Sequence, residues 1–259
     1  NENFVIIDIT DAAPKVIGEC DGFSAPMLIH EEAIYIQDGQ QYQVERLDYH
    51  DKKAYVRRVD VDYYTDANLA VDLKVLDVFD EIAGESIVKA WGEVRVSALV
   101  TMFKKIKLYT HENIGSGPVD LPEQEMHTTA CWLGLKDNVT CGMSRLDVDE
   151  GLRGFSNALV NVAPLYLMCD PGDIRVVCQV RSPFSGLPSV YIYDNYPGGI
   201  GFSEKLFEMH DELIKAAGDL VRACSCESGC PSCVGAAVGE GTGGKDVALR
   251  IIDKISVGR

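Results

Sequence analysis

The 259-residue sequence combines 46% hydrophobic with 25% charged residues, a balance that excludes disordered and collagen-like chains. It contains no apolar run of the ~18 residues that a membrane span requires, so we expect no membrane partner. The formal net charge of −16 disfavours tight binding to nucleic acid by the chain as a whole, because an acidic surface repels phosphates on average.

The start of the chain and its cysteine count indicate the cellular compartment. The sequence begins NENFVIIDIT, which has neither an initiator Met nor the regions of a signal peptide. Nine cysteines, an odd number, fit a reducing compartment better than a secreted disulfide framework. We therefore expect a cytoplasmic protein, of which this chain is a fragment.

The first half of the chain has the pattern of β-strands. Residues 1–70 read as a small β meander or barrel of short strands, with a hairpin signal at Asp38-Gly39. Residues 71–146 predict longer antiparallel strands that continue the sheet. In the stretch VKAWGEVRVSALV, apolar and polar residues alternate as in a half-buried strand.

Residues 147–259 are predicted to form an α/β zinc-binding module. Apolar residues recur at helical spacing at Leu152, Phe155, Leu159 and Val162. Pro164 should kink or end that helix, and Ser203 is a candidate N-cap for one long helix further on. The predicted fold class is α+β, an antiparallel β-rich N-terminal part followed by a helix-containing part with a four-cysteine zinc site.

Two small basic clusters stand out against the acidic composition. Residues 1–100 contain 9 basic and 20 acidic residues. The clusters are Lys52, Lys53, Arg57 and Arg58, and then Lys104, Lys105 and Lys107. They are candidates for nucleic-acid contact, although charged residues that blunt exposed strand edges give the same pattern. The sequence leaves both interpretations open.

Four cysteines lie within ten residues near the C-terminus. They are Cys224, Cys226, Cys230 and Cys233, with the spacing C-x-C-x3-C-x2-C. Four thiolates at this spacing can surround one Zn²⁺, and such a closed site has no open position for substrate. We therefore predict one structural zinc per chain, which pins the long helix to the final helix, and no catalytic residue in this cluster.

Cys226, Cys230 and Cys233 alone also spell C-x3-C-x2-C, the cluster motif of radical S-adenosylmethionine enzymes. Those enzymes build a partial barrel largely downstream of the motif, whereas only 26 residues follow Cys233. Cys224 would in addition be a spare fourth ligand. The spacing thus favours zinc over a [4Fe-4S] cluster.

The run from Gly239 to Lys245 matches the phosphate-binding pattern G-x-x-x-x-G-K. Asp246 stands where a Ser or Thr hydroxyl should reach Mg²⁺, and a carboxylate there would repel phosphates. We therefore interpret this run as a glycine-rich connector that leads into a helix.

A third candidate site lies at the end of the strand SVYIYD. Tyr193 and Asp194 precede a glycine-rich turn at residues 197–201, where α/β folds often build sites. A self-contained enzyme with a pocket at Tyr193, Asp194 and Gly198 is therefore an alternative, against an ordinary strand-to-helix turn. His127 and Cys131 are expected to be a surface histidine and a core cysteine.

Two groups of motifs together resemble one known family. YIYDNYPGGIGFSEKLFE and CSCESGCPSCVG look like the C-terminal region of MrfA-type superfamily 2 DEAD/DEAH-box DNA repair helicases, including their zinc-binding domain, once a domain of unknown function. Earlier stretches such as AIYIQDGQQYQVERLD, VDYYTDA and LPEQEMHTTACWL also resemble that family. The resemblance spans nearly the whole chain.

The resemblance implies a function for the parent protein and a role for this part of it. The parent would be a 3′ to 5′ ATP-dependent DNA translocase whose two RecA-like motor domains lie upstream. The motor motifs are not in this sequence, so the chain would be a noncatalytic accessory region that packs on the motor. Its partners would be those motor domains and single-stranded DNA, which it helps to engage or guide.

Overall fold

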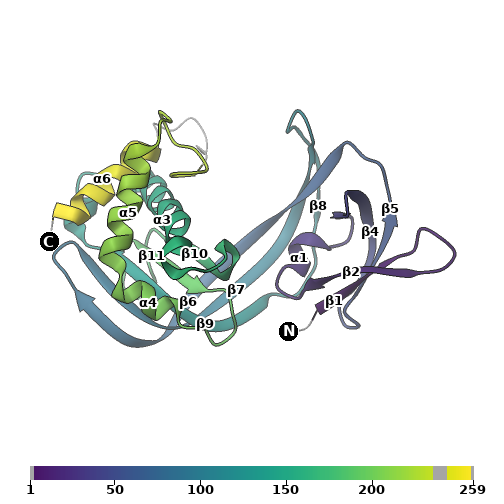
Figure 1. Ribbon diagram of the computed structural model, residues 1–259, viewed down its shortest axis with the longest axis horizontal. Helices are drawn as coiled ribbons and strands as arrows, with labels where there is room; N and C mark the ends of the chain where they lie inside the picture. The colour runs from purple at the N-terminus through teal and green to yellow at the C-terminus, as the bar shows by residue number, and fades with distance from the viewer. Residues whose placement is uncertain (1–2, 236–243, 258–259) are drawn as a thin grey trace. The chain divides into compact units, whose positions relative to one another are not determined.

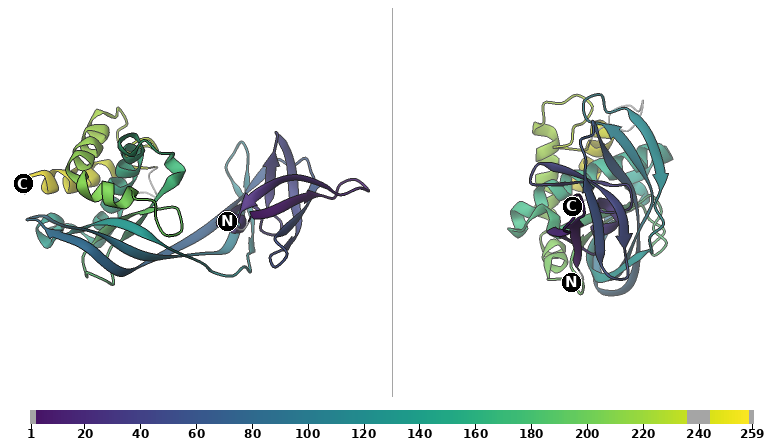
Figure 2. Two further views of the ribbon diagram at one scale, coloured as in Figure 1. Left: turned by 60° about the horizontal axis from the view of Figure 1, so that its bottom comes forward. Right: turned by 90° about the vertical axis from the view of Figure 1, so that its right-hand side faces the viewer.

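The computed structural model of the protein describes residues 3–235 and 244–257 and has an α+β fold (Figures 1 and 2). The elements in chain order are β1 (Asn3–Asp8), β2 (Lys15–Asp21), α1 (Ala25–Leu28), β3 (Ile34–Gln37), β4 (Gln40–Asp48), β5 (Lys53–Arg58), β6 (Tyr63–Ala83), β7 (Ile87–Lys107), β8 (Asn113–Pro118), β9 (Gln124–Leu135), α2 (Asp137–Thr140), α3 (Arg145–Leu167), β10 (Ile174–Gln179), β11 (Ser189–Asp194), α4 (Phe202–Glu208), α5 (His210–Ala223) and α6 (Gly244–Val257). The predicted fold class is confirmed. No helix among the described residues is long and apolar enough to cross a membrane.

The chain divides into two compact units that are discontinuous in sequence. The N-terminal unit comprises residues 1–71 and 97–125, and the C-terminal unit comprises residues 72–96 and 126–259. The long strands β6 and β7 contribute residues to both units. The division into residues 1–70, 71–146 and 147–259 stays a prediction.

The N-terminal unit is built on a five-stranded sheet with the order β2-β1-β5-β4-β3. Its neighbouring strands are antiparallel except for β1 and β5, which run parallel. Alternate residues of these strands face a small core, so that Phe4 and Ile6 of β1 are fully buried. Asp38 and Gly39 both have positive φ, the conformation of the tight hairpin turn that their sequence predicts.

The C-terminal unit combines a sheet with a layer of helices. The strand order is β10-β11-β9-β7-β6, and β11, which lies between β10 and β9, is buried along its whole length. Helices α3 to α6 gather on one face of β9, β10 and β11 (Figures 1 and 2). Because the helices cover that face, its strands carry apolar side chains toward them.

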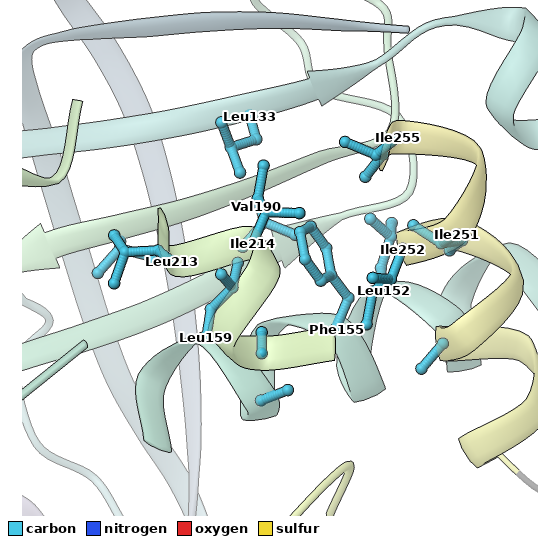
Figure 3. Close-up of a cluster of buried hydrophobic side chains, with 14 of the residues drawn as sticks. Leu133, Leu152, Phe155, Leu159, Val190, Leu213, Ile214, Ile251, Ile252 and Ile255 are labelled. Carbon is cyan, nitrogen blue, oxygen red and sulfur yellow. The ribbon is translucent and has the colours of Figure 1, made fainter. Parts of the chain in front are cut away.

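Helix α3 lies at the centre of the C-terminal core. Leu152 and Phe155 of α3 point toward Ile251 and Ile252 of α6, with Ile214 of α5 beside them (Figure 3). Full burial of each such side chain contributes about 1.5–3 kcal/mol. These contacts hold three helices, from distant parts of the sequence, around one core.

The sequence predicts that Pro164 kinks or ends helix α3. The helix does not end there but continues through Pro164 to Leu167. Pro164 lies in the last turn, where the missing N–H removes one helical hydrogen bond, and its ring is buried in the core. Met168, which follows the helix, adopts the left-handed conformation and ends it.

The prediction of one long helix from Ser203 is also wrong. The segment forms α4 and α5, with a break at Met209. The N-cap of α4 is Gly201, with φ +95°, and Ser203 lies inside the helix and is buried. The cap comes from a carboxylate outside the helix, that of Asp194 at the end of β11.

Candidate metal centre and basic clusters

The four cysteines follow α5 directly and come together in one cluster. Their Sγ atoms all lie within 4.8 Å of one another. The Sγ–Sγ distances are 3.5 Å for Cys224–Cys226, 3.5 Å for Cys224–Cys230, 3.4 Å for Cys226–Cys233 and 3.5 Å for Cys230–Cys233. Four sulfurs bound to a central Zn²⁺ at ~2.3 Å in a tetrahedron lie about 3.8 Å apart. The donor set and its spacing therefore fit zinc, and the presence of Cys224 makes four thiols rather than three.

The loop that carries the cysteines depends on a tight local fold. The backbone N–H groups of Cys233 and Gly235 both donate to the carbonyl oxygen of Cys230 at 3.0 Å. Gly229 has φ +130°, and a Cβ at that position would lie 2.6 Å from Cγ2 of Val234. Only glycine fits this combination of conformation and close approach. Cys233 is fully buried and joins the hydrophobic core of the unit.

Helix α3 holds one side of the cysteine loop. Nδ2 of Asn157 donates to the carbonyl oxygens of Cys233 at 2.8 Å and Pro231 at 3.1 Å. Nδ2 of Asn161, one turn further, donates to Pro231 at 3.3 Å. These amides satisfy carbonyl groups that have no partner in regular secondary structure.

Helix α6 holds the other side of the loop. Nζ of Lys245 donates to the carbonyl oxygens of Cys224 at 2.6 Å and Cys226 at 2.8 Å. Lys245 is the lysine of the phosphate-loop-like run, whose residues 239–243 lie outside the described residues. Its ammonium group here binds backbone of the cysteine loop, and also places a positive charge near the thiols.

Close packing joins the two helices that hold the loop. A Cβ on Gly154 of α3 would lie 2.9 Å from Cβ of Ala248 in α6 and 3.1 Å from Cβ of Val234. A Cβ on Gly151 would lie 2.5 Å from Cδ1 of Ile251. The two glycines therefore allow α3 and α6 to approach each other beside the cysteine loop.

The electrostatics of the cluster favour a bound cation. The backbone N–H of Cys226, together with neighbouring thiols, lowers the pKa of Cys224 to about 7. Hydrogen bonding within the cluster, first with Cys233, raises the pKa of Cys230. Crowded thiols resist joint ionisation, and a divalent cation makes ionisation of all four favourable. With four protein ligands the site is closed, so its chemistry is structural rather than catalytic.

The polar strand end at β11 is a helix cap. The carboxylate of Asp194 accepts hydrogen bonds from the backbone N–H groups of Ile200 (2.7 Å), Gly201 (3.1 Å), Phe202 (3.2 Å) and Ser203 (2.9 Å). Oγ of Ser203 lies 2.5 Å from Oδ1 of the same carboxylate. Asp194 is fully buried, so its acceptor positions serve α4 and the turn before it.

Tyr193 and Cys131 are buried, whereas His127 lies at the surface. Burial raises the pKa of Tyr193 to about 12, and that of Cys131 likewise to about 12. His127 is exposed and lies 3.7 Å from Glu93. The prediction of a surface histidine and a core cysteine is confirmed.

All seven residues of the two basic clusters belong to the N-terminal unit. Four of them pair with carboxylates, in the pairs Lys53–Asp51 (3.8 Å), Arg57–Glu45 (2.6 Å), Arg58–Asp8 (3.5 Å) and Lys105–Glu32 (2.9 Å). Nζ of Lys52 lies over the rings of Phe4 and Tyr49. Within the part of the chain that the structure describes, Lys104 and Lys107 have no carboxylate partner. Their contact with nucleic acid stays a prediction.

The cysteine-rich region and the whole chain are similar to known proteins. Residues 155–234 match the MrfA Zn-binding domain. The chain is 48% identical over 98% of its length to the Uncharacterized ATP-dependent helicase YprA of Bacillus subtilis, and 23% identical over 91% to the ATP-dependent helicase HRQ1 of Saccharomyces cerevisiae. It covers 34% of the first relative and 23% of the second, and so spans about a third or less of their length.

Solved structures of a DUF1998 helicase, MrfA, share this fold. One in complex with DNA superposes with a TM-score of 0.73 and 47% identity, over 99% of this chain and 34% of that one. Another structure of MrfA gives a TM-score of 0.69 and 41% identity, over 97% of this chain and 34% of that one. The resemblance to MrfA-type helicases is confirmed, and the match to a zinc-binding domain agrees with the four-cysteine cluster in supporting a structural zinc.

Proposed function

We propose that this chain, which carries an MrfA Zn-binding domain, is a noncatalytic C-terminal accessory region of an ATP-dependent DNA helicase. Cys224, Cys226, Cys230 and Cys233 hold one structural zinc ion. The motor domains lie upstream in the same polypeptide, and this region helps them to engage or guide single-stranded DNA. The parent protein acts in DNA repair in the cytoplasm.

One observation carries the structural part of this proposal, the double attachment of the cysteine loop. Asn157 on α3 and Lys245 on α6 bind backbone carbonyls on both sides of the cluster, and the loop itself continues α5. An ion at the cluster therefore fixes the point where three helices meet. This is the role expected of a closed four-thiolate site.

The part of the proposal that concerns DNA rests on the relatives. Two of them are named ATP-dependent helicases, and a structural relative is described with bound DNA. This chain is about a third of such proteins, which leaves room for a motor elsewhere in the polypeptide. Lys104 and Lys107, which have no carboxylate partner among the described residues, are the basic side chains best placed to bind phosphates.

The alternative of a self-contained enzyme loses its motivating feature. Asp194 directs both carboxylate oxygens at backbone N–H groups of the following helix and turn, and Tyr193 is buried. A carboxylate in these bonds and fully shielded from water is a cap rather than an acid or base for a substrate.

The test is a comparison in the full-length helicase. Replacement of Cys226 and Cys233 by Ser should abolish DNA unwinding while the upstream motor retains basal ATP hydrolysis. Cys141→Ser, at an exposed cysteine outside the cluster, is the matched control and should unwind as the parent does. Unwinding at the parental rate by the double variant would contradict the proposal, as would ATP turnover by the pure 259-residue chain.

A further inference from the structure

A hairpin in the N-terminal unit presents an aromatic side chain to solvent. Strands β7 and β8 pair from Met102 opposite Pro118 to Ile106 opposite Asn113, and the chain reverses between them. Tyr109 in this turn is 89% exposed, more than any other Phe, Trp or Tyr among the described residues. Its ring offers an apolar face for stacking and a polar hydroxyl at its edge.

Several hydrogen bonds fix the turn that carries Tyr109. The N–H of Lys107 donates to the carbonyl oxygen of Glu112 at 3.0 Å. The N–H of His111 donates to the carbonyl oxygen of Lys107 at 3.1 Å. The N–H of Leu108 donates to the carbonyl of Asp62 at 2.9 Å, which ties the turn to the segment before β6. The tip is therefore a built structure, and its aromatic side chain projects from a fixed backbone.

The local charge around Tyr109 is opposite to that of the chain. Residues 104–112, KKIKLYTHE, contain three lysines and one carboxylate, that of Glu112, which accepts a hydrogen bond from Oγ1 of Thr110 at 3.2 Å. The segment is therefore basic on balance in a protein of net charge −16. Lys105 is bound to Glu32, whereas Lys104 and Lys107 have no carboxylate partner in the described structure. Lys104 is exposed, so its charge is available to a partner.

We infer that the tip of the β7–β8 hairpin binds single-stranded nucleic acid, with the ring of Tyr109 stacked on a base and Lys104 and Lys107 on neighbouring phosphates. Exposed aromatic rings beside basic residues are the usual means of binding single strands without sequence preference, since every base has a π-face. The charge selects a polyanion over an apolar protein surface. This inference rests on the proposed function and adds the side chain that holds a base.

The test is the affinity of the 259-residue chain for a fluorescein-labelled oligothymidylate of about 16 nucleotides, measured by anisotropy over a range of salt. Tyr109→Ala should weaken binding about 5- to 150-fold, the loss that removal of one stacked base gives. Tyr109→Trp keeps a stacking ring and should bind as the parent does.

The salt dependence separates stacking from charge. Lys104→Ala should reduce the slope of log K against log salt by about 0.7, the value for one phosphate contact on a single strand. Tyr109→Ala should leave that slope unchanged, because it removes no charge. A slope that falls with Tyr109→Ala would overturn the stacking role.

Met168→Ala is the matched control, because Met168 is 91% exposed but is followed by Asp170 and Asp173 instead of lysines. It should bind as the parent does, and an equal loss there would overturn the inference. If the parent chain binds DNA and Tyr109→Ala binds equally well, the inference fails and the proposed function stands. If the parent chain binds no DNA, the inference fails, and the unwinding test of the cysteine variant still decides the proposed function.

Discussion

Two loops of the C-terminal unit expose many backbone polar groups, and each is held in a different way. The turn at residues 195–203 is held by the carboxylate of Asp194, at the end of the neighbouring strand. This group is part of the chain itself, so the turn needs no added ligand. The loop at residues 224–235 gathers four thiols around a point that a cation must fill to neutralise four thiolates. The first loop should therefore fold in any buffer, whereas the second should depend on metal supply.

The largest expected effect comes from breaking the metal-dependent loop. Cys226→Ser with Cys233→Ser removes two ligands, and the chain should lose its zinc and the cooperative thermal melt of the C-terminal unit. Apparent zinc-binding free energies of structural sites reach about 10–16 kcal/mol in small peptides, so loss of the zinc should destabilise the unit more than any single substitution that leaves the zinc bound. Elemental analysis and circular dichroism measure both. Cys141→Ser should behave as the parent, and zinc retained at one ion per chain in the double variant would refute this account.

Breaking the carboxylate-held turn should destabilise the unit without loss of metal. Asp194→Asn puts an amide NH₂ where N–H groups need acceptors, which should lower the free energy of unfolding by about 3 kcal/mol. Urea unfolding monitors this change, with zinc content measured in parallel. Asp219→Asn, at an exposed site on α5, should change stability by less than about 1 kcal/mol. Loss of zinc from Asp194→Asn would show that the two loops are not independent.

The approach of α3 to α6 beside the cysteine loop can be tested by adding one methyl group. Gly154→Ala places Cβ 2.9 Å from that of Ala248, and the overlap should cost about 2 kcal/mol. In an unhindered helix the same replacement stabilises by about 1 kcal/mol, so the sign of the effect is diagnostic. Gly115→Ala, whose Cβ would have its nearest neighbour at 3.8 Å, tests the added methyl group without steric overlap, in strand β8 rather than in a helix. Thermal melts that rise with Gly154→Ala would contradict the packing.

A smaller effect should follow when the hydrogen bonds between α6 and the cysteine loop are removed. Lys245→Met keeps most of the side-chain length and removes two hydrogen bonds to carbonyls of the loop, at a cost of about 1 kcal/mol. Zinc transfer to a chromogenic chelator should be faster than in the parent. Lys215→Met, at an exposed lysine of α5, should leave the transfer rate unchanged. Equal transfer rates in the two variants would mean that Lys245 does not secure the loop.

The smallest effect concerns a carboxylate cap in solvent, the exposed counterpart of Asp194. The N–H and side chain of Ser144 lower the pKa of Asp147 below its ordinary value of 3.8 in the folded state. A lowered folded pKa adds stability above the unfolded pKa, and that stability disappears as pH falls through the folded value. The melting temperature should thus fall more steeply below about pH 4 in the parent than in Asp147→Asn. Identical profiles between pH 2 and 5 would argue against the cap.

Local sequence signals predicted much of the fold. The strands of both units follow from alternating apolar residues, and the Asp38-Gly39 turn follows from its backbone preference. The cysteine cluster could be predicted from spacing alone, because four thiols within ten residues are close in space whenever the loop between them turns back on itself. These features depend on neighbours in the chain, which is why one sequence suffices to find them.

The features that the sequence did not reveal depend on distant residues. Asn157 binds the cysteine loop from more than 60 residues upstream, and Lys245 binds it from the last position of the glycine-rich run. Neither belongs to a motif of metal ligands. The break between α4 and α5, and the cap by Asp194, likewise arise from tertiary contact rather than from local propensity. Lys245 does belong to a recognisable pattern, but that pattern is typical of phosphate binding and does not indicate the contact with the cysteine loop.

The most direct test of the metal-held core is elemental analysis of the anaerobically purified chain, followed by hydrogen exchange before and after a strong chelator. The account predicts one zinc per chain, and after chelation a loss of protection that begins in the cysteine loop and the adjoining ends of α3, α5 and α6. Iron in place of zinc, or zinc whose removal leaves the protection of these helices unchanged, would contradict it.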